Sequence, residues 1–187
     1  MCEGVFRCVC GPMFSGKTTE LIRQARSCLA AGRKIVVFKH KIDDRYSFEK
    51  VVTHDGDLIE AILVSTSQDI QKWIDKNPSV YMIFIDEVQF FDEGIKDVIS
   101  NLLRTKHNVT VVGLDMDFMG NPFPVAMWCL ATADIVLKLK GICKDCQGDS
   151  TFSWRLDFSD NKEIVSIGGA ESYVPLCRSC YYRKLSS

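Results

Sequence analysis

The chain has 187 residues, of which 47% are hydrophobic and 25% are charged. This composition is typical of one globular domain with room for a small appendage, and it excludes a disordered or collagen-like chain. The net charge of −1 provides no basic excess for broad binding to nucleic acid or to an anionic membrane. Apolar runs such as Val80 to Ile85 are much shorter than the roughly 20 residues of a membrane helix. The N-terminus lacks the pattern of a secretory signal, so we expect a cytoplasmic protein.

Segments of strand length alternate with segments of helical period along the first 140 residues. We expect a strand at 5–10, then a glycine-rich loop, then a helix that ends near Gly32. Further strands are expected at 34–39, 81–86, 109–114 and 134–139, with short strands around an Asp55-Gly56 turn. Further helices are expected at 67–76, with Ser67 as N-cap, at 92–105 and at 126–133.

This alternation predicts an α/β fold with a mostly parallel sheet and helices on both faces, and the glycine-rich loop GPMFSGKT makes it P-loop NTPase-like. After residue 140 we find no helical period, and two CxxC pairs appear instead. We therefore place a P-loop nucleotide-binding α/β domain at 1–140 and a small zinc-binding lasso domain at 141–187.

A phosphate-binding loop is predicted between the first strand and the first helix. The segment GPMFSGKT fits the pattern GxxxxGK[ST] in the strand–loop–helix context that makes this motif credible. Backbone N–H groups of such a loop bind phosphate, its lysine neutralises the β- and γ-phosphates, and its hydroxyl ligates Mg²⁺. The predicted nucleotide-binding residues are Gly11, Pro12, Met13, Phe14, Ser15, Gly16, Lys17 and Thr18.

An acidic pair, Asp86-Glu87, ends the strand at 81–86. In parallel α/β sheets the ligand lies outside the carboxyl ends of the strands, so these carboxylates should lie near the phosphates. One of them can hold Mg²⁺ while the other acts as a base or aligns a water molecule. The alternative is a solvated acidic pair.

Four of the nine cysteines form two CxxC pairs, whose spacing suits tetrahedral Zn²⁺. Four thiolate ligands leave no open position, so the zinc should be structural. Two disulfides or free thiols are the alternative, which a reducing compartment disfavours. The predicted ligands are Cys143, Cys146, Cys177 and Cys180, and we expect the other five cysteines to be packing residues.

Several motifs in one order extend these predictions. The segments GPMFSGKTTELIR, IDDRYS, THDG, IDEVQFF, GLDMDFMGNPF, the double CxxC and IGGAESYVPLC follow one another. In this respect the chain, from about residue 5 to 183, resembles the type II thymidine kinase family of cellular, bacterial and poxvirus enzymes. The resemblance implies ATP-dependent phosphoryl transfer to the 5′-hydroxyl of thymidine or deoxyuridine, in deoxynucleotide salvage, by a homotetramer.

The resemblance also implies roles for individual residues. Glu87 would be the general base, Asp86 would help to hold Mg²⁺, and Gln89 would contact the nucleotide. Asp43 and Arg45 would lie beside the phosphates. The residues that would surround thymidine are Met13, Phe90, Leu114, Phe118, Phe123 and Tyr173. The loop between the CxxC pairs would be a lasso, and the residues that would cover the base are Ile164, Val165, Ser166, Ile167 and Gly168.

Two other functions compete with a nucleoside kinase. An ATP-dependent nucleic-acid-binding module with a zinc ribbon would combine the same two motifs. The near-zero charge and the lack of a basic stripe weigh against it, so we expect neither a nucleic-acid nor a membrane partner. A zinc-stabilised nucleotide-binding regulator without catalysis is the other alternative, and the position of Glu87 weighs against that.

Overall fold

The computed structural model describes residues 4–42, 50–52, 58–156 and 172–186. Its centre is a six-stranded sheet in which every neighbouring pair is parallel, in the order β5-β2-β6-β7-β1-β8. The strands are β1 (Phe6–Cys10), β2 (Ile35–His40), β5 (Ile62–Val64), β6 (Met82–Asp86), β7 (Asn108–Gly113) and β8 (Ile135–Lys138). The predicted α/β fold with a parallel sheet is confirmed.

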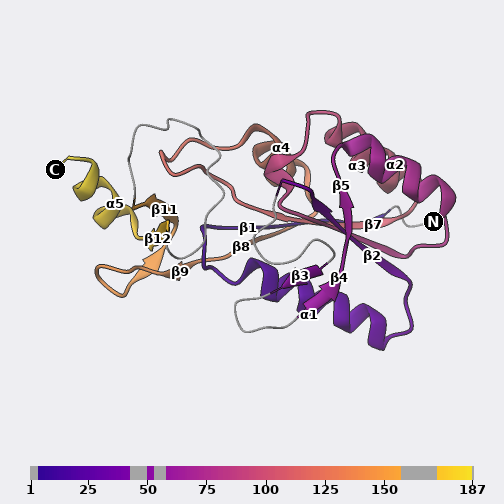
Figure 1. Cartoon of the computed structure of the whole chain (residues 1–187), viewed down its shortest axis with the longest axis horizontal. Helices are drawn as coiled ribbons and strands as arrows, with labels where there is room; N and C mark the ends of the chain where they lie inside the picture. Colours follow the sequence, from indigo (N-terminus) through magenta and orange to yellow (C-terminus); the bar gives the residue numbers. More distant parts are fainter. Residues whose placement is uncertain (1–3, 43–49, 53–57, 157–171, 187) are drawn as a thin grey trace.

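Helices cover both faces of this sheet. The helices are α1 (Lys17–Ala30), α2 (Ser67–Lys76), α3 (Ile95–Arg104) and α4 (Pro124–Thr132). Figure 1 shows α1 on one side of the sheet and the other three helices on the opposite side. Within the described ranges, no helix is long and apolar enough to cross a membrane.

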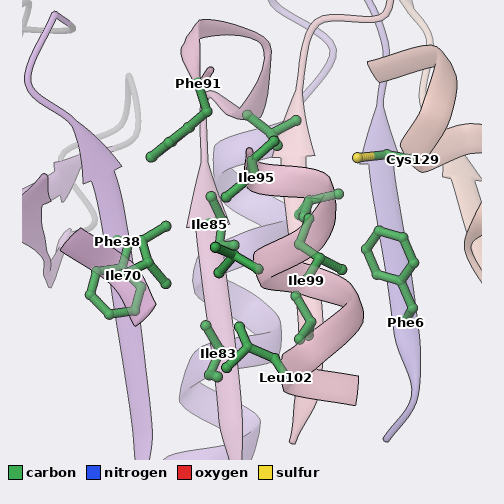
Figure 2. Close-up of a cluster of buried hydrophobic side chains, with 14 of the residues drawn as sticks. Phe6, Phe38, Ile70, Ile83, Ile85, Phe91, Ile95, Ile99, Leu102 and Cys129 are labelled. Carbon is green, nitrogen blue, oxygen red and sulfur yellow. The ribbon is translucent and has the colours of Figure 1, made fainter. Parts of the chain in front are cut away.

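Two apolar cores hold the layers together, one on each face of the sheet. The larger core lies under α2, α3 and α4 and includes Ile99, Ile83 and Phe38, all fully buried (Figure 2). The smaller core lies under α1 and includes Leu21 and Val9. All five residues of β6 are buried because this strand has helices on both faces and strands on both edges, which explains its unbroken apolar run. Of the cysteines expected to be packing residues, Cys8, Cys10 and Cys129 lie in the larger core and Cys28 packs against the smaller one.

Element boundaries differ from the predicted ones by a few residues. Helix α2 begins at Ser67, but its N-cap is Thr66, whose side chain accepts from the Asp69 N–H in a capping box. Ser67 instead donates its hydroxyl to Asp92 before α3. Helix α4 begins two residues earlier than predicted because Pro124 occupies its first turn, where a missing N–H costs nothing.

A small antiparallel pair, β3 (Lys50–Val52) and β4 (Leu58–Glu60), lies between β2 and β5 in the chain. Short strands were predicted around Asp55-Gly56, and that turn lies outside the described residues.

The end of the chain forms a separate module of short strands and one helix, which Figure 1 shows at the far end from the N-terminus. Two antiparallel pairs build it, followed by α5 (Arg178–Leu185). The strands are β9 (Gly141–Ile142), β10 (Asp149–Ser150), β11 (Phe152–Arg155) and β12 (Tyr173–Leu176). The expectation of no helix after residue 140 was wrong. Helix α5 has only two buried residues, Cys180 and Tyr181, so it lacks the apolar stripe by which a helix is recognised in a sequence.

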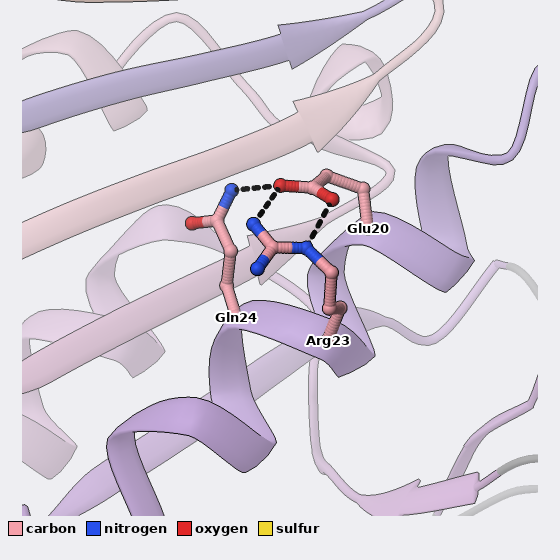
Figure 3. Close-up of polar contacts among 3 residues, drawn as sticks. All are labelled: Glu20, Arg23 and Gln24. Carbon is pink, nitrogen blue, oxygen red and sulfur yellow. Dashed lines mark hydrogen bonds and ion pairs between the residues drawn. The ribbon is translucent and has the colours of Figure 1, made fainter. Parts of the chain in front are cut away.

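The exposed side of α1 carries a cluster of polar contacts (Figure 3). Arg23 donates twice to Glu20, at 2.7 Å each, and Gln24 donates to Glu20 at 2.8 Å. The Arg23 guanidinium lowers the pKa of the Glu20 carboxyl. Because the Arg23 side chain is largely exposed, this pair contributes little to stability.

Candidate active site and metal centre

The predicted phosphate-binding loop connects β1 to α1, as its motif requires. Gly11 has φ 149°, and a Cβ there would overlap the Leu139 carbonyl oxygen, so only glycine fits. Gly16, the N-cap of α1, has φ 82° and also needs glycine. Helix α1 then begins at Lys17, and Thr18 lies in its first turn. The first N–H groups of this helix therefore face the loop, which is the arrangement that binds phosphate.

Three side chains hold one peptide group of this loop. The Pro12 carbonyl accepts from Lys17 Nζ at 2.7 Å and from Ser15 Oγ at 2.8 Å. The N–H of Met13, in the same peptide, donates to Ser153 Oγ at 2.9 Å. The Lys17 ammonium thus lies at the centre of the loop.

The acidic pair lies at the same edge of the sheet as the loop. Asp86 ends β6, which is separated from β1 only by β7, and all three strands run in parallel. Asp86 is buried, and its Oδ1 accepts from the Glu87 N–H at 3.0 Å. Glu87 has φ 52° and ψ 47°, a left-handed conformation that costs a residue other than glycine about 1–3 kcal/mol. Such strain persists where the surroundings over-determine it, often at functional sites.

Gln89 orients the Glu87 carboxylate. Its Nε2 donates to Glu87 Oε2 at 2.5 Å, and its Oε1 accepts from the Leu114 N–H at 3.0 Å. A Cβ at Gly113 would overlap Gln89 Oε1, so the glycine at the end of β7 leaves room for this bridge. Glu87 is therefore held at the end of β6 by a side chain that is itself anchored at the end of β7.

The predicted thymidine-contacting residues lie on several elements around this edge. Met13 belongs to the phosphate-binding loop, Phe90 to a short 3-10 helix (Val88–Phe90), and Leu114 follows β7. These three side chains are half-buried, as are those of Phe118 and Phe123. Tyr173, in β12, is buried. Asp43, Arg45 and the segment 164–168 lie outside the described residues.

The C-terminal module holds the loop that carries Phe118. Tyr181 of α5 donates its hydroxyl to the Phe118 carbonyl at 2.9 Å, and the Arg155 guanidinium lies 5.4 Å from the Phe118 ring centre. The Asp117 carboxylate stabilises the same loop, because its Oδ1 accepts hydrogen bonds from the Met119 and Asn121 N–H groups. Tyr181 and Ser153 were not predicted as site residues, because nothing in their local sequence pattern indicates contacts with loops so distant in the chain.

An ion pair at the end of the sheet was also missed. Lys138 Nζ lies 2.8 Å from Asp115 Oδ2, and Asp115 is almost fully buried. The pair joins the segment after β7 to β8, across the end of β1 that leads into Gly11. Its hydrogen bond to Asp115 raises the pKa of Lys138. Asp115, the first aspartate of GLDMDF, stands out in the sequence as a charged residue after an apolar strand. Its partner Lys138 can be identified only from the fold.

The four predicted metal ligands come together in the module. The Sγ atoms of Cys143, Cys146, Cys177 and Cys180 all lie within 4.8 Å of one another. The Cys146 and Cys177 sulfurs are 3.6 Å apart, which excludes a disulfide of about 2.05 Å between them. Tetrahedral zinc with Zn–S bonds of about 2.3 Å separates its sulfurs by roughly 3.8 Å, so the cluster fits zinc.

Backbone donors surround one of these thiols. Burial raises the pKa of Cys143, but N–H groups of Cys177, Cys146 and Asp145 outweigh that effect and bring its pKa to about 6. By contrast, burial raises the pKa of the core thiol Cys129 to about 12. Cys143 therefore favours the thiolate form that metals bind, whereas the side-chain contact with Cys177 raises the pKa of the neighbouring ligand Cys180 to about 12.

Comparison with known protein families agrees with this geometry. A family model described as Thymidine kinase matches residues 4–181, from just before β1 into α5. The match covers both the phosphate-binding loop and the four cysteines, and this family consists of ATP-dependent phosphotransferases that act on a nucleoside. The chain belongs to the thymidine kinase family.

Proposed function

We propose that the protein transfers the γ-phosphoryl group of ATP to the 5′-hydroxyl of thymidine and deoxyuridine, in the cytoplasmic salvage of pyrimidine deoxynucleotides. The observation that carries this proposal is the position of Glu87. It follows β6 at the same edge of the sheet as the phosphate-binding loop, and Gln89 holds its carboxylate. A carboxylate so placed serves a reaction at a phosphate, which simple nucleotide binding does not require.

On the ATP side, the residues from Gly11 to Thr18 bind the phosphates. The N–H groups at the start of α1 and the Lys17 ammonium neutralise the negative charge that develops on the β- and γ-phosphates. Mg²⁺, when bound, would supply positive charge that stabilises the phosphates. The Thr18 hydroxyl and the Asp86 carboxylate have the oxygen chemistry to hold it. Asp43 and Arg45 complete the phosphate site by resemblance to the family.

Glu87 acts as the general base. Its carboxylate accepts the proton of the nucleoside 5′-hydroxyl while that oxygen bonds to the γ-phosphorus, and the bond to the β–γ bridging oxygen breaks to release ADP. The Gln89 amide donates to Oε2 and so holds the carboxylate in position. Gln89 acts through this contact, beside the nucleotide contact that the family resemblance implies.

On the acceptor side, Met13, Phe90, Leu114, Phe118, Phe123 and Tyr173 line the thymidine pocket. Half-buried apolar side chains around one edge support this, because a flat base needs apolar walls with a few fixed polar groups. Residues 164–168 of the lasso supply main-chain hydrogen bonds to the base.

The metal is structural Zn²⁺, which would hold together the lasso domain at 141–187, beside the nucleotide-binding domain at 1–140. Four thiolates leave zinc no open position for a substrate. By resemblance to the family, the protein assembles as a homotetramer.

The test compares thymidine, deoxycytidine and single-stranded DNA as stimulants of ATP turnover. A thymidine kinase forms one thymidine monophosphate for each ADP and is not stimulated by DNA. Stimulation by DNA without a nucleotide product would refute the proposal. A rate of ATP hydrolysis that none of the three additions changes would refute the proposal as well.

A further inference from the structure

The Pro12–Met13 peptide of the phosphate-binding loop is held at both ends. Its carbonyl oxygen faces Lys17 Nζ and Ser15 Oγ, at 2.7 and 2.8 Å. Its N–H donates to Ser153 Oγ at 2.9 Å. Two of these contacts are local, but Ser153 lies 140 residues further along the chain, in β11 of the C-terminal module.

We propose that Ser153 is a positioning residue for the phosphates of the nucleotide. By accepting the Met13 N–H, it fixes the rotation of the Pro12–Met13 peptide so that the carbonyl faces Lys17. Lys17 then has an acceptor within the loop and stays where the β- and γ-phosphates bind. The inference rests on the proposed function only in taking this loop as the ATP site.

The position of Ser153 depends in turn on the folded module. Strand β11 pairs with β12, so that Ser153 lies opposite Pro175, two residues before Cys177. The neighbouring Phe152 ring stacks on Tyr181 at 4.4 Å, and Ser153 itself is only 6% exposed. The cysteine cluster therefore fixes the strand that carries this hydroxyl.

A second close approach joins the module to the same loop. A Cβ added at Gly141, at the start of β9, would lie 3.3 Å from the Phe14 carbonyl oxygen and 2.8 Å from Ser150 Oγ. The loop backbone and the module backbone therefore pack together without an intervening side chain at this point. The Ser153 hydrogen bond is therefore part of a larger contact between the loop and the module, and not an isolated surface contact.

Without the Ser153 hydroxyl, the peptide group loses its fixed rotation. A peptide that rotates about its flanking bonds turns its carbonyl away from Lys17 and its N–H toward the loop. The Lys17 ammonium then has to be ordered when the phosphates arrive, and that ordering weakens binding. One hydrogen bond of this kind corresponds to a change in affinity of about 3- to 10-fold.

The test uses ADP, which occupies the loop without turnover, and four variants of the full chain. Ser153→Ala and Ser153→Val remove the hydroxyl, and Ser153→Thr, nearly isosteric with valine, keeps it. Ser150→Ala is the matched control, because Ser150 is a fully buried serine of the same module whose Oγ has no hydrogen-bond partner among the described residues. Calorimetry gives the ADP dissociation constant, and nuclear magnetic resonance gives the exchange rate of the Met13 amide.

We expect Ser153→Ala and Ser153→Val to weaken ADP binding about 3- to 10-fold and to speed exchange of the Met13 amide. Ser153→Thr and Ser150→Ala should match the unaltered protein in both measurements. If Ser153→Ala does not fold, the comparison of Ser153→Thr with Ser153→Val decides the outcome. Unchanged ADP affinity in Ser153→Val, or an equal loss in Ser150→Ala, would overturn the proposal. If thymidine were not phosphorylated but the Ser153 effects appeared, the proposed function would fail and the positioning role would stand.

Discussion

The sheet region and the C-terminal module are stabilised in different ways. The sheet has an extensive apolar core on each face, built from residues such as Ile83, Ile99 and Leu21. Among the described residues of the module, its core consists of five buried ones, and two of them are the predicted metal ligands Cys143 and Cys180. A unit of this size cannot bury enough apolar surface to fold alone and usually needs a metal or disulfides. Apolar burial thus holds the edge of the sheet that carries Glu87, and the cysteine cluster lies in the small core of the module that contacts it.

The largest effect should be the loss of turnover in Glu87→Gln. This change should impair the reaction while both regions stay folded. Without a carboxylate to accept the 5′-hydroxyl proton, turnover should fall by about 100- to 10,000-fold. ATP and thymidine dissociation constants, measured by calorimetry, should stay within about threefold, because the amide has the same shape. Near-normal turnover would refute the role of Glu87 as base.

Ile99→Ala should test how strongly the sheet depends on its core. Ile99 is fully buried in α3 against the sheet (Figure 2), so the cavity should lower the free energy of unfolding by about 2–5 kcal/mol. Urea denaturation measures this loss, and Ile99→Val should cost only about 0.5–1.5 kcal/mol. Metal content should be unchanged in both variants. Loss of metal together with stability would contradict the separation of the two regions.

Cys177→Ser should affect the module and leave the sheet folded. We expect release of zinc and at least a tenfold loss of thymidine affinity, because the segment that we propose to cover the base lies between the two CxxC pairs. ATP affinity should fall less, by the amount that the Ser153 contact contributes. Cys28→Ser, in α1 and outside the cluster, is the control and should keep its zinc. Equal losses of thymidine and ATP affinity would indicate unfolding of the whole protein.

A smaller change should follow from Thr66→Ala, at the start of α2. Loss of the capping box should reduce the free energy of unfolding by about 1 kcal/mol. Thr132→Ala removes a hydroxyl that bonds only within its own helix and should be close to neutral. Thermal unfolding followed by circular dichroism distinguishes the two, and equal shifts in both would argue against the cap.

The smallest effect should be a difference in stability that disappears in acid. Burial raises the pKa of Asp92, but the Ser67 N–H and hydroxyl and the Gly94 N–H outweigh that effect, so its pKa is lowered. A lowered folded-state pKa stabilises the protein above the ordinary aspartate pKa of about 3.9, and this stabilisation is lost as the pH falls through the lowered value. The stability difference between the unaltered protein and Asp92→Asn should therefore close below about pH 4. A difference that does not change with pH would contradict this.

Much of the sheet region could be predicted because its signals are local. The apolar run before Asp86 indicates a strand with both faces covered, and GPMFSGKT between a strand and a helix indicates the phosphate-binding loop. The family motifs indicate Gln89, but its bridge from Glu87 to the Leu114 N–H depends on two parallel strands that end side by side. No pattern in one strand carries that information.

The module was harder to predict, apart from its CxxC pairs. Helix α5 is short and polar, with Cys177 Sγ accepting from the Cys180 N–H at its start, so its stability comes from the cluster and from Tyr181 packing. The Ser153 contact joins residues 140 positions apart. Such contacts follow from tertiary packing, and neither spacing nor hydrophobic period indicates them.

We propose that apolar burial holds the sheet while the cysteine cluster, with a bound metal, holds the module. Hydrogen exchange of the zinc-loaded protein, before and after removal of zinc by a chelator, tests it directly. Exchange should rise across β9 to β12 and α5, and to a smaller extent at Met13, while β6, β7 and α3 keep their protection. An equal rise in both regions, or no rise in either, would contradict the account.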